Sequence, residues 1–365
     1  MNKKILLSAH DLDLGGIETA LVAIANYLAE KNYEITIALE KKQGEFLKRL
    51  HKEIKLIEYG TNESKNIIIR KLCNFVNRLK FIKNYKNKFD FSASFATYSL
   101  ASSFMARTAS KNSALWCHAD YLTLYKGNKE EVKTFFENVN YKKFSHIIFV
   151  SKEGANRFIE IFPEQKEKTL TCNNIIDGKS IIEKSEETVT EKQIQEISKK
   201  EIPIFINVGR HDERQKKLTR IIEATKKLKE ENFHFKVLFI GDGQDTKIYQ
   251  EKVTEYHLDD TILFLGRKEN PYPYMKLSDC VILSSEYEGY PVVYLESFVL
   301  NKPIITTKVS DYEQVENGRG IVVEKNTQAI YQAMKDFLQN GYNITNDFDY
   351  EKYNANILKI LETMI

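Results

Sequence analysis

The chain has 365 residues, of which 42% are apolar, 12% aromatic and 29% charged, and its formal net charge is +3. This length suits two α/β domains better than one, and the apolar share is sufficient for two packed cores. The small net charge gives no argument for nucleic-acid binding, and no stretch approaches the roughly 20 apolar residues of a membrane span.

The N-terminal half predicts short buried strands that alternate with amphipathic helices. Its first run, Lys4–Ala9, follows a lysine pair as in a signal peptide, but His10 and Asp11 interrupt the apolar sequence. We therefore interpret it as a strand and expect a cytoplasmic protein. Gly15 and Gly16 then open a predicted helix, Ile17–Lys31. The strands predicted in this half are Lys4–Ala9, Glu34–Leu39, Ile54–Tyr59, Phe91–Phe95, Ala114–His118, His146–Val150 and Thr169–Asn173.

The segment Lys65–Lys88 is basic and amphipathic. It contains eight Lys or Arg residues and no Asp or Glu, and apolar residues such as Ile68, Leu72 and Leu79 recur at helical spacing. This pattern is typical of a helix that binds an anionic membrane surface. An ordinary domain helix with a solvated basic face is the alternative.

Between the two halves lies Gly178–Glu201, a polar segment crowded with Lys and Glu that we interpret as a linker. The second strand–helix series predicts strands at Pro203–Val208, Lys236–Ile240, Thr261–Leu265, Cys280–Ser284, Pro303–Thr307 and Gly320–Val323. We thus expect an α/β protein with two Rossmann-like domains facing each other across a cleft. The predicted parts are an acceptor-side domain (1–177), the linker (178–201), a donor domain (202–345) and a C-terminal helix that packs back toward the first domain (346–365).

Two cations follow the first strand of the second half. In Asn207-Val-Gly-Arg-His-Asp-Glu-Arg-Gln-Lys216, a strand ends at Gly209, and Arg210 and Lys216 bracket the turn. A guanidinium that grips oxygens in a fork, with a nearby ammonium, suits a diphosphate. Lys217 is an alternative to Lys216, and solvated surface cations are the other interpretation.

Two carboxylates flank the start of a nearly all-apolar helix in Ser284-Ser-Glu-Tyr-Glu-Gly-Tyr-Pro-Val-Val-Tyr-Leu-Glu296. Glu288 precedes the helix N-terminus, where free backbone N–H groups gather, and Glu296 lies on the helix. This arrangement suits a ligand with hydroxyls at one end and phosphate at the other. Alternatively, Glu296 pairs with a buried Arg and Glu288 is solvated.

Glu288-Gly-Tyr-Pro…Glu296 resembles the E-x7-E signature of the retaining family-4 glycosyltransferases (glycosyl transferases group 1), which have the GT-B fold and include enzymes of bacterial polysaccharide and glycolipid synthesis. The resemblance is strongest over about residues 203–324. It implies that Glu288 contacts the donor sugar together with Gly289, Tyr290 and Pro291, and that Glu296 binds the nucleotide ribose. Arg210 and Lys216, after Gly209, would neutralise the donor diphosphate.

Further positions carry over from the resemblance. Gly241-Asp-Gly243 resembles the family's second strand-end turn, although G-x-G alone is weak. Gly266 and Arg267 resemble the segment that contacts the nucleotide base. The family places a glycine loop over the donor phosphates and acceptor, which gives that role to Gly15 and Gly16, with simple turn geometry as the alternative.

The acceptor side carries one further pair of candidates, in Trp116-Cys-His-Ala-Asp120. His118 matches the family's histidine near the anomeric centre, and a core-capping histidine is the alternative. Asp120 is a candidate for the acceptor pocket.

The implied reaction is sugar transfer from a nucleotide sugar, most simply a UDP-sugar, to a hydroxyl of a lipid-linked or growing cell-surface glycan. We expect no metal and no cofactor, because Arg210 and Lys216 supply the charge that a cation would supply, and Asp11-Leu-Asp13 and Asp347-Phe-Asp349 do not adjoin the donor motifs. We expect contact with the inner face of the cell membrane through 65–88, and no nucleic-acid partner. A sugar-nucleotide epimerase and a non-catalytic nucleotide-sugar-binding subunit are the alternatives, and donor hydrolysis would separate the latter from an enzyme.

Overall fold

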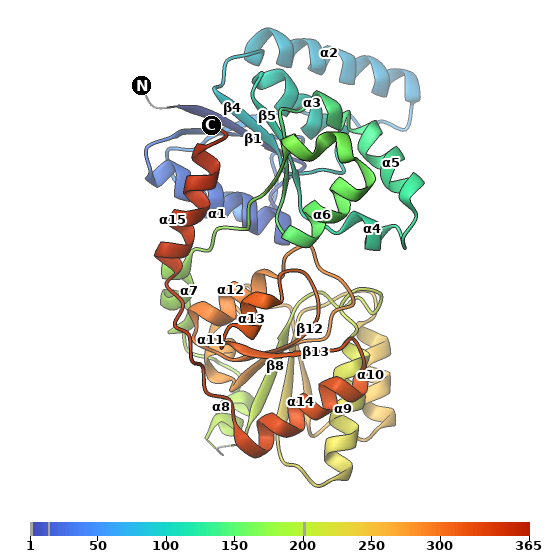
Figure 1. Cartoon of the computed structure of the whole chain (residues 1–365), viewed down its shortest axis with the longest axis vertical. Coiled ribbons are helices and arrows are strands. Elements are labelled where there is room, and N and C mark those ends of the chain that lie inside the picture. The colour runs from blue at the N-terminus through green and yellow to red at the C-terminus, as the bar shows by residue number, and fades with distance from the viewer. Residues whose placement is uncertain (1–2, 14, 200–201) are drawn as a thin grey trace. The chain divides into compact units, whose positions relative to one another are not determined.

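The computed structural model describes residues 3–13, 15–199 and 202–365. Contacts within the chain divide it into two compact units. Figure 1 shows the chain with colours that follow the residue number. The N-terminal unit comprises Met1–Ile176 and Lys352–Ile365, and the C-terminal unit comprises Asp177–Glu351. Each unit is described by itself.

The N-terminal unit is built on a seven-stranded parallel sheet of order β3-β2-β1-β4-β5-β6-β7. Helices pack around this sheet because its strands are apolar on both faces, as parallel sheets require. Its strands are β1 (Lys4–Ala9), β2 (Glu34–Leu39), β3 (Lys55–Glu58), β4 (Phe91–Ser94), β5 (Ser113–Cys117), β6 (His146–Phe149) and β7 (Thr169–Thr171). Its helices are α1 (Gly16–Glu30), α2 (Ile67–Tyr85), α3 (Leu100–Ala109), α4 (Tyr121–Leu124), α5 (Lys129–Asn138) and α6 (Lys152–Ile161), with short 3-10 turns at Glu45–Arg49, Tyr141–Lys143 and Pro163–Lys168.

The C-terminal unit repeats this topology with a six-stranded parallel sheet of order β10-β9-β8-β11-β12-β13. Its strands are β8 (Ile204–Val208), β9 (Lys236–Ile240), β10 (Ile262–Gly266), β11 (Cys280–Leu283), β12 (Ile304–Thr307) and β13 (Gly320–Val323). Its helices are α7 (Gly178–Ser185), α8 (Lys192–Ser198), α9 (Leu218–Glu230), α10 (Thr246–Glu255), α11 (Tyr272–Leu277), α12 (Val292–Val299), α13 (Glu313–Glu316) and α14 (Thr327–Asn340).

The expected fold class is confirmed: both units are α/β with parallel Rossmann-like sheets. In each sheet the order reverses beside the first strand, between β1 and β4 and between β8 and β11. Ligands of open parallel sheets bind beyond the carboxyl ends of the strands at such a reversal. In the C-terminal unit, the turns after β8 and β11 are therefore where a ligand is expected to bind.

The segment 178–201, interpreted from sequence as a linker, contains two helices that belong to the C-terminal unit. Helix α7 packs on α11 and α12. Tyr274 of α11 donates a hydrogen bond of 2.7 Å to Glu191, just before α8. The sequence of this segment is mostly polar because only a few of its residues, including Ile181 and Ile194, face the core.

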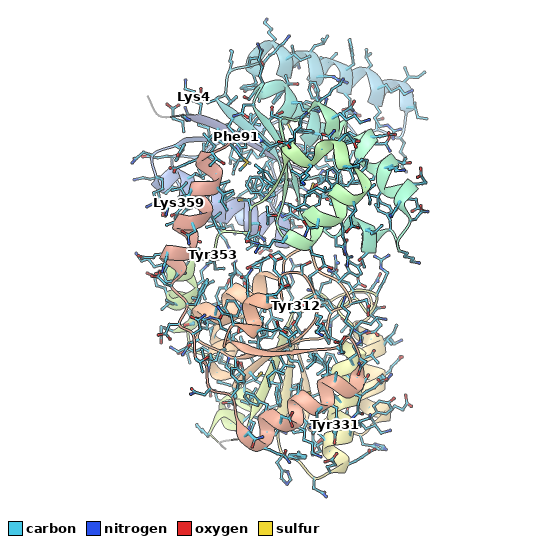
Figure 2. All side chains as sticks on the ribbon, viewed as in Figure 1. Lys4, Phe91, Tyr312, Tyr331, Tyr353 and Lys359 are labelled. Atoms are coloured by element: carbon cyan, nitrogen blue, oxygen red, sulfur yellow. The ribbon has the colours of Figure 1, made fainter. Side chains whose placement is uncertain are left out.

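The last helix, α15 (Tyr350–Glu362), returns to the N-terminal unit from residue 352 onward. Tyr353 (Figure 2) donates a hydrogen bond of 3.0 Å to the carbonyl of Asn174, and the Asn354 side chain bonds both the N–H and the carbonyl of Ile176. These hydrogen bonds join the two chain segments of the N-terminal unit near the points where the chain leaves it and returns to it. Among the described residues, no helix has the length and apolar character needed to cross a membrane.

Helix α2 has its apolar stripe on the outside. Figure 1 shows α2 at the edge of the N-terminal unit, next to α3. Its attachment is made by Asn74 and Asn77, which bond Asn62 and Gly60, and by Phe81, which packs on Tyr59 and Phe104. The opposite side carries exposed apolar residues: Ile67, Ile68, Ile69, Leu72, Phe75, Val76 and Leu79.

Candidate functional site

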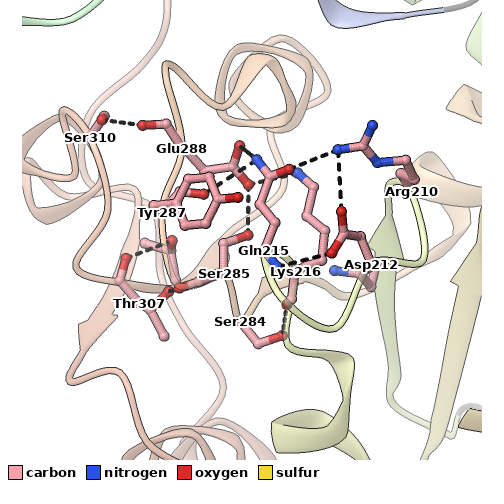
Figure 3. Close-up of polar contacts among 12 residues, drawn as sticks. Arg210, Asp212, Gln215, Lys216, Ser284, Ser285, Tyr287, Glu288, Thr307 and Ser310 are labelled. Carbon is pink, nitrogen blue, oxygen red and sulfur yellow. Dashed lines mark hydrogen bonds and ion pairs between the residues drawn. The ribbon is translucent and has the colours of Figure 1, made fainter. Parts of the chain in front are cut away.

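The turns after β8 and β11 lie side by side in the C-terminal unit and bring Lys216 to Glu288. The Lys216 ammonium lies 2.6 Å from a Glu288 carboxylate oxygen, although the residues are 72 positions apart. Both side chains are largely buried, with 16% and 8% of their surface exposed. This contact (Figure 3) joins the two motifs that the sequence analysis singles out separately.

Two further side chains bond the Glu288 carboxylate, and a third bonds the backbone of the same residue. Ser285 donates to it at 2.7 Å and the Gln215 amide at 3.2 Å. The backbone carbonyl of Glu288 accepts a hydrogen bond of 2.6 Å from Ser310 in the turn after β12. Because these donors converge, the Glu288 carboxylate is held as an acceptor in one orientation. Gln215, Ser285 and Ser310 carry no motif signal and were missed in the sequence.

Lys216, and not Lys217, is the lysine of this cluster. Lys217 begins α9 with a left-handed backbone (φ 51°), and its ammonium lies 3.9 Å from Glu213. Arg210 is 66% exposed, and its guanidinium bonds Gln215 at 3.0 Å and lies 3.5 Å from Asp212. Gln215 thus links Arg210 to Glu288 (Figure 3). A buried ammonium and an exposed guanidinium at one strand end suit a dianionic ligand group.

Glu296 lies on α12, which begins just after Glu288. Gly289, Tyr290 and Pro291 form the connecting turn, so the first N–H groups of α12 lie next to the Glu288 position. Burial raises the pKa of Glu296 to about 7, while a hydrogen bond of 3.1 Å from the Tyr272 hydroxyl and the Lys216 charge oppose this rise. Tyr272 was not predicted. The predicted alternative, a buried Arg partner for Glu296, is not found among the described residues.

Two glycines allow the turns after β8 and β9 to touch. Gly241 has φ +144°, and a Cβ there would lie 1.8 Å from the carbonyl oxygen of Gly209. A Cβ on Gly243 would lie 2.2 Å from the carbonyl oxygen of His211. This close approach is the physical reason for the G-x-G pattern. Gly266 ends β10 with φ +66°, and Arg267 after it is exposed.

His211 is a buried residue of the same turn that the sequence analysis left aside. Its Nδ1 lies 2.8 Å from the Thr246 hydroxyl of α10, and aromatic rings of Phe239, Tyr249 and Phe264 surround it. Burial lowers its pKa, so the ring is neutral at physiological pH. Its contacts hold the Arg210 turn against α10.

In the N-terminal unit, His118 follows β5 directly. Burial lowers its pKa to about 3, and its Nε2 is buried without a hydrogen-bond partner among the described residues. The imidazole is therefore neutral, and its predicted place near the anomeric centre stays a prediction. Asp120 instead caps α4 by accepting from the Thr123 N–H at 3.2 Å and also bonds the Arg157 guanidinium. This use of the carboxylate is structural, and its predicted contact with an acceptor stays a prediction.

Gly15 and Gly16 begin α1. Gly15 is extended (φ −165°), Gly16 has no atom within 4 Å of its built Cβ position, and neither needs a left-handed backbone. Turn geometry therefore does not require these glycines. Burial raises the pKa of Glu18 in the first turn, and the charges of Asp11 and Asp13 add to this rise. So many carboxylates favour hydroxyls over phosphate at this helix end.

Known proteins resemble this chain in sequence and in fold. Residues 188–355 match the family described as Glycosyl transferases group 1. An uncharacterized glycosyltransferase of Methanocaldococcus jannaschii is 30% identical over 194 residues, which are 53% of this chain and 47% of that protein. The N-acetylgalactosamine-N,N'-diacetylbacillosaminyl-diphospho-undecaprenol 4-alpha-N-acetylgalactosaminyltransferase of Campylobacter jejuni is 25% identical over 212 residues, 57% of this chain and 54% of that protein. The chain thus spans about half the length of these curated relatives.

Solved structures agree over nearly the whole chain. Anabaena HepE in complex with UDP and glucose has a TM-score of 0.77 at 18% identity, covering 99% of this chain and 100% of that one. S. aureus TarM in complex with fondaparinux, alpha-GlcNAc-glycerol and UDP has a TM-score of 0.74 at 12% identity, covering 99% of both chains. At these identities the likeness shows the fold. The chain therefore has the two-sheet GT-B fold, and its residues 188–355 match the glycosyl transferases group 1 family.

Proposed function

We propose that the chain transfers a sugar from a UDP-sugar to a hydroxyl of a lipid-linked or growing cell-surface glycan, with retention at the anomeric carbon. The observation that carries this proposal is the contact of Lys216 with Glu288 at the strand-order reversal. Glu288 directly precedes α12, the helix that carries Glu296. Structures of similar fold were solved with UDP and with UDP-glucose. The Campylobacter relative's name contains a diphospho-undecaprenol acceptor.

The proposed reaction gives each charged group one task. The bond between the anomeric carbon and the diphosphate oxygen breaks, and the diphosphate leaves with the electron pair. The acceptor oxygen bonds to the anomeric carbon from the same face, and its proton passes to the departing oxygen. Arg210 and Lys216 stabilise the charge that develops on the diphosphate. Glu288 accepts hydrogen bonds from hydroxyls of the transferred sugar, and Glu296 accepts them from hydroxyls of the ribose.

The proposal predicts turnover without a divalent ion. Donor hydrolysis and transfer should persist in EDTA, because Arg210 and Lys216 supply the positive charge. Arg210→Ala should lower turnover by about 10²-fold or more, the usual effect of losing one group that stabilises developing charge. Lys247→Ala is a control, because this exposed lysine lies in α10 and pairs with Glu251 of the same helix. Loss of activity in EDTA that manganese restores would contradict the metal-free mechanism.

We further propose that α2 attaches the chain to an anionic membrane, where a lipid-linked acceptor is present. Seven of its apolar side chains are exposed, including Ile68 (77%), Leu72 (63%) and Phe75 (57%). Exposed apolar residues concentrated on one helix indicate an interaction surface. The same segment carries the cations of 65–88, and each cation that faces an acidic lipid surface contributes up to about 1 kcal/mol.

Sedimentation with vesicles tests this attachment. Wild-type protein should pellet with vesicles of 30% phosphatidylserine at low salt and less at high salt, because screening weakens exposed charges beyond about 10 Å. The triple substitution Lys80→Gln, Lys83→Gln and Lys86→Gln should pellet less and retain its nucleotide affinity. Substitution of Lys226, Lys247 and Lys325 by Gln is the charge-matched control. Equal pelleting of both variants would assign α2 no membrane role.

A further inference from the structure

A cavity of about 740 Å³ lies within the N-terminal unit, apart from the residues assigned to the donor. Residues that follow four neighbouring strands line it: His10 after β1, Glu40 after β2, Tyr59 after β3 and Tyr98 after β4. Helices α2 and α3 supply the remaining wall. The carboxyl edge of a parallel sheet at its order reversal is where such folds bind ligands.

The lining of this cavity includes a fixed carboxylate. Glu40 is 5% exposed, one of its oxygens accepts from the Ser99 hydroxyl, and the other accepts from Thr61 at 3.0 Å. His10 Nδ1 lies 3.4 Å from Glu40. A carboxylate has about four acceptor positions, so these contacts leave Glu40 able to accept from ligand hydroxyls. A buried, oriented acceptor of this kind distinguishes one hydroxyl pattern from another.

The part of the lining that α2 supplies is basic. Arg70, Lys71 and Arg78 of α2 line the cavity, and none of them makes an ion pair with a carboxylate among the described residues. The Arg78 guanidinium lies 4.3 Å from the centre of the Phe104 ring, which fixes it at the cavity wall. Two guanidiniums and an ammonium on one wall suit phosphate oxygens. Groups that suit hydroxyls and groups that suit phosphate therefore line one cavity.

We propose that this cavity binds the acceptor as a saccharide phosphate or diphosphate, with Glu40 selecting the hydroxyl pattern of the saccharide and Arg70, Lys71 and Arg78 holding the phosphate. The inference rests on the proposed function, because it identifies the acceptor of that reaction. The exposed apolar residues belong to the same helix as these cations, so a lipid chain attached to the phosphate has an apolar surface nearby.

Titration calorimetry of the full chain, without donor, tests the assignment. The probes are decyl diphosphate and decyl diphosphates that carry glucose, galactose, N-acetylglucosamine or N-acetylgalactosamine. At least one saccharide probe should bind about tenfold more tightly than decyl diphosphate, since a hydrogen bond to a charged group has about that effect. Glu40→Gln should abolish this difference and leave decyl diphosphate binding unchanged. The triple substitution of Arg70, Lys71 and Arg78 by Gln should weaken all probes about tenfold or more.

Controls separate the possible outcomes. Glu63→Gln and Lys52→Gln change exposed groups of the same unit outside the cavity and should bind all probes as wild type does. His10→Gln, at a 31% exposed side chain, tests hydroxyl recognition if Glu40→Gln does not fold. The 1-phosphate of the best-bound sugar, without a lipid, distinguishes a soluble acceptor from a lipid-linked one.

Two results would overturn the assignment: wild-type binding in the triple variant at low salt, or no saccharide probe that binds more tightly than decyl diphosphate. A wild-type chain that binds no UDP-sugar but responds as expected to these variants would instead contradict the proposed transfer reaction. The binding role of the cavity would then stand.

Discussion

Replacing Lys216 by Met will lower the turnover of bound UDP-sugar by about 10²–10³-fold, the effect expected when one buried group that stabilises developing charge is removed. Lys216 is the buried cation of the site, 2.6 Å from Glu288. Methionine fills a similar volume without the charge, so the loss will lie mainly in kcat, measured with saturating donor. A fall of less than tenfold would remove Lys216 from the mechanism.

Neighbouring substitutions test whether the effect is specific. Lys217→Met changes the adjacent lysine, which lies 3.9 Å from Glu213 and away from Glu288, and it should retain turnover within about twofold because an exposed pair contributes little. Glu288→Gln should lose turnover to a similar extent as Lys216→Met while UDP affinity is retained. Because the two residues act as one unit, the double variant should be little worse than either single one.

The same variants also predict a stability difference. Lys216→Met leaves Glu288 largely buried without its cation, which typically costs about 3–5 kcal/mol when a buried pair is broken. Restoring neutrality with the second substitution, Glu288→Gln, should recover part of the melting temperature but none of the activity. This split separates the catalytic effect of the charge from its effect on folding.

Local patterns in the sequence were sufficient for the strands, because buried parallel strands are continuous apolar runs such as Val237–Ile240. They were insufficient where two distant segments meet. The Lys216–Glu288 contact and the Gln215 and Ser285 bonds depend on the neighbouring positions of β8 and β11, which no local spacing encodes. The family resemblance identified Lys216 and Glu288 as candidates, and the structure shows that they are in contact.

For helix α2, the sequence did not show which side of the helix faces the core. Its apolar period was evident in the sequence, but a period does not say which side faces the core. In the structure the inward side is held by Asn74, Asn77 and Phe81, so the apolar stripe faces outward. The cavity behind α2 was not predicted, because Glu40, Arg70 and Arg78 come from separate segments that meet only in the folded sheet edge.

The affinity for UDP-glucose should rise about tenfold between pH 6 and pH 8 if Glu296 binds the ribose as a carboxylate. Burial raises the pKa of Glu296 to about 7, so the free chain is mostly protonated there at pH 6 and mostly ionised at pH 8. Ribose hydroxyls donate to the ionised form, so binding releases a proton and the apparent affinity follows the ionised fraction. The esterified diphosphate of UDP-glucose avoids the terminal phosphate ionisation near pH 6 that would complicate UDP.

Burial shifts the pKa of two histidines among the candidate residues downward. The pKa of His118 falls to about 3, so its ring stays neutral throughout, and burial also lowers the pKa of His211. Glu296→Gln should therefore give a flat pH profile, with an affinity at pH 8 about tenfold below that of wild type. Tyr272→Phe removes a hydrogen bond that lowers the pKa of Glu296, so its profile should move to higher pH. A Glu296→Gln variant that keeps the wild-type pH dependence would show that another group titrates, and the ribose assignment would then fail.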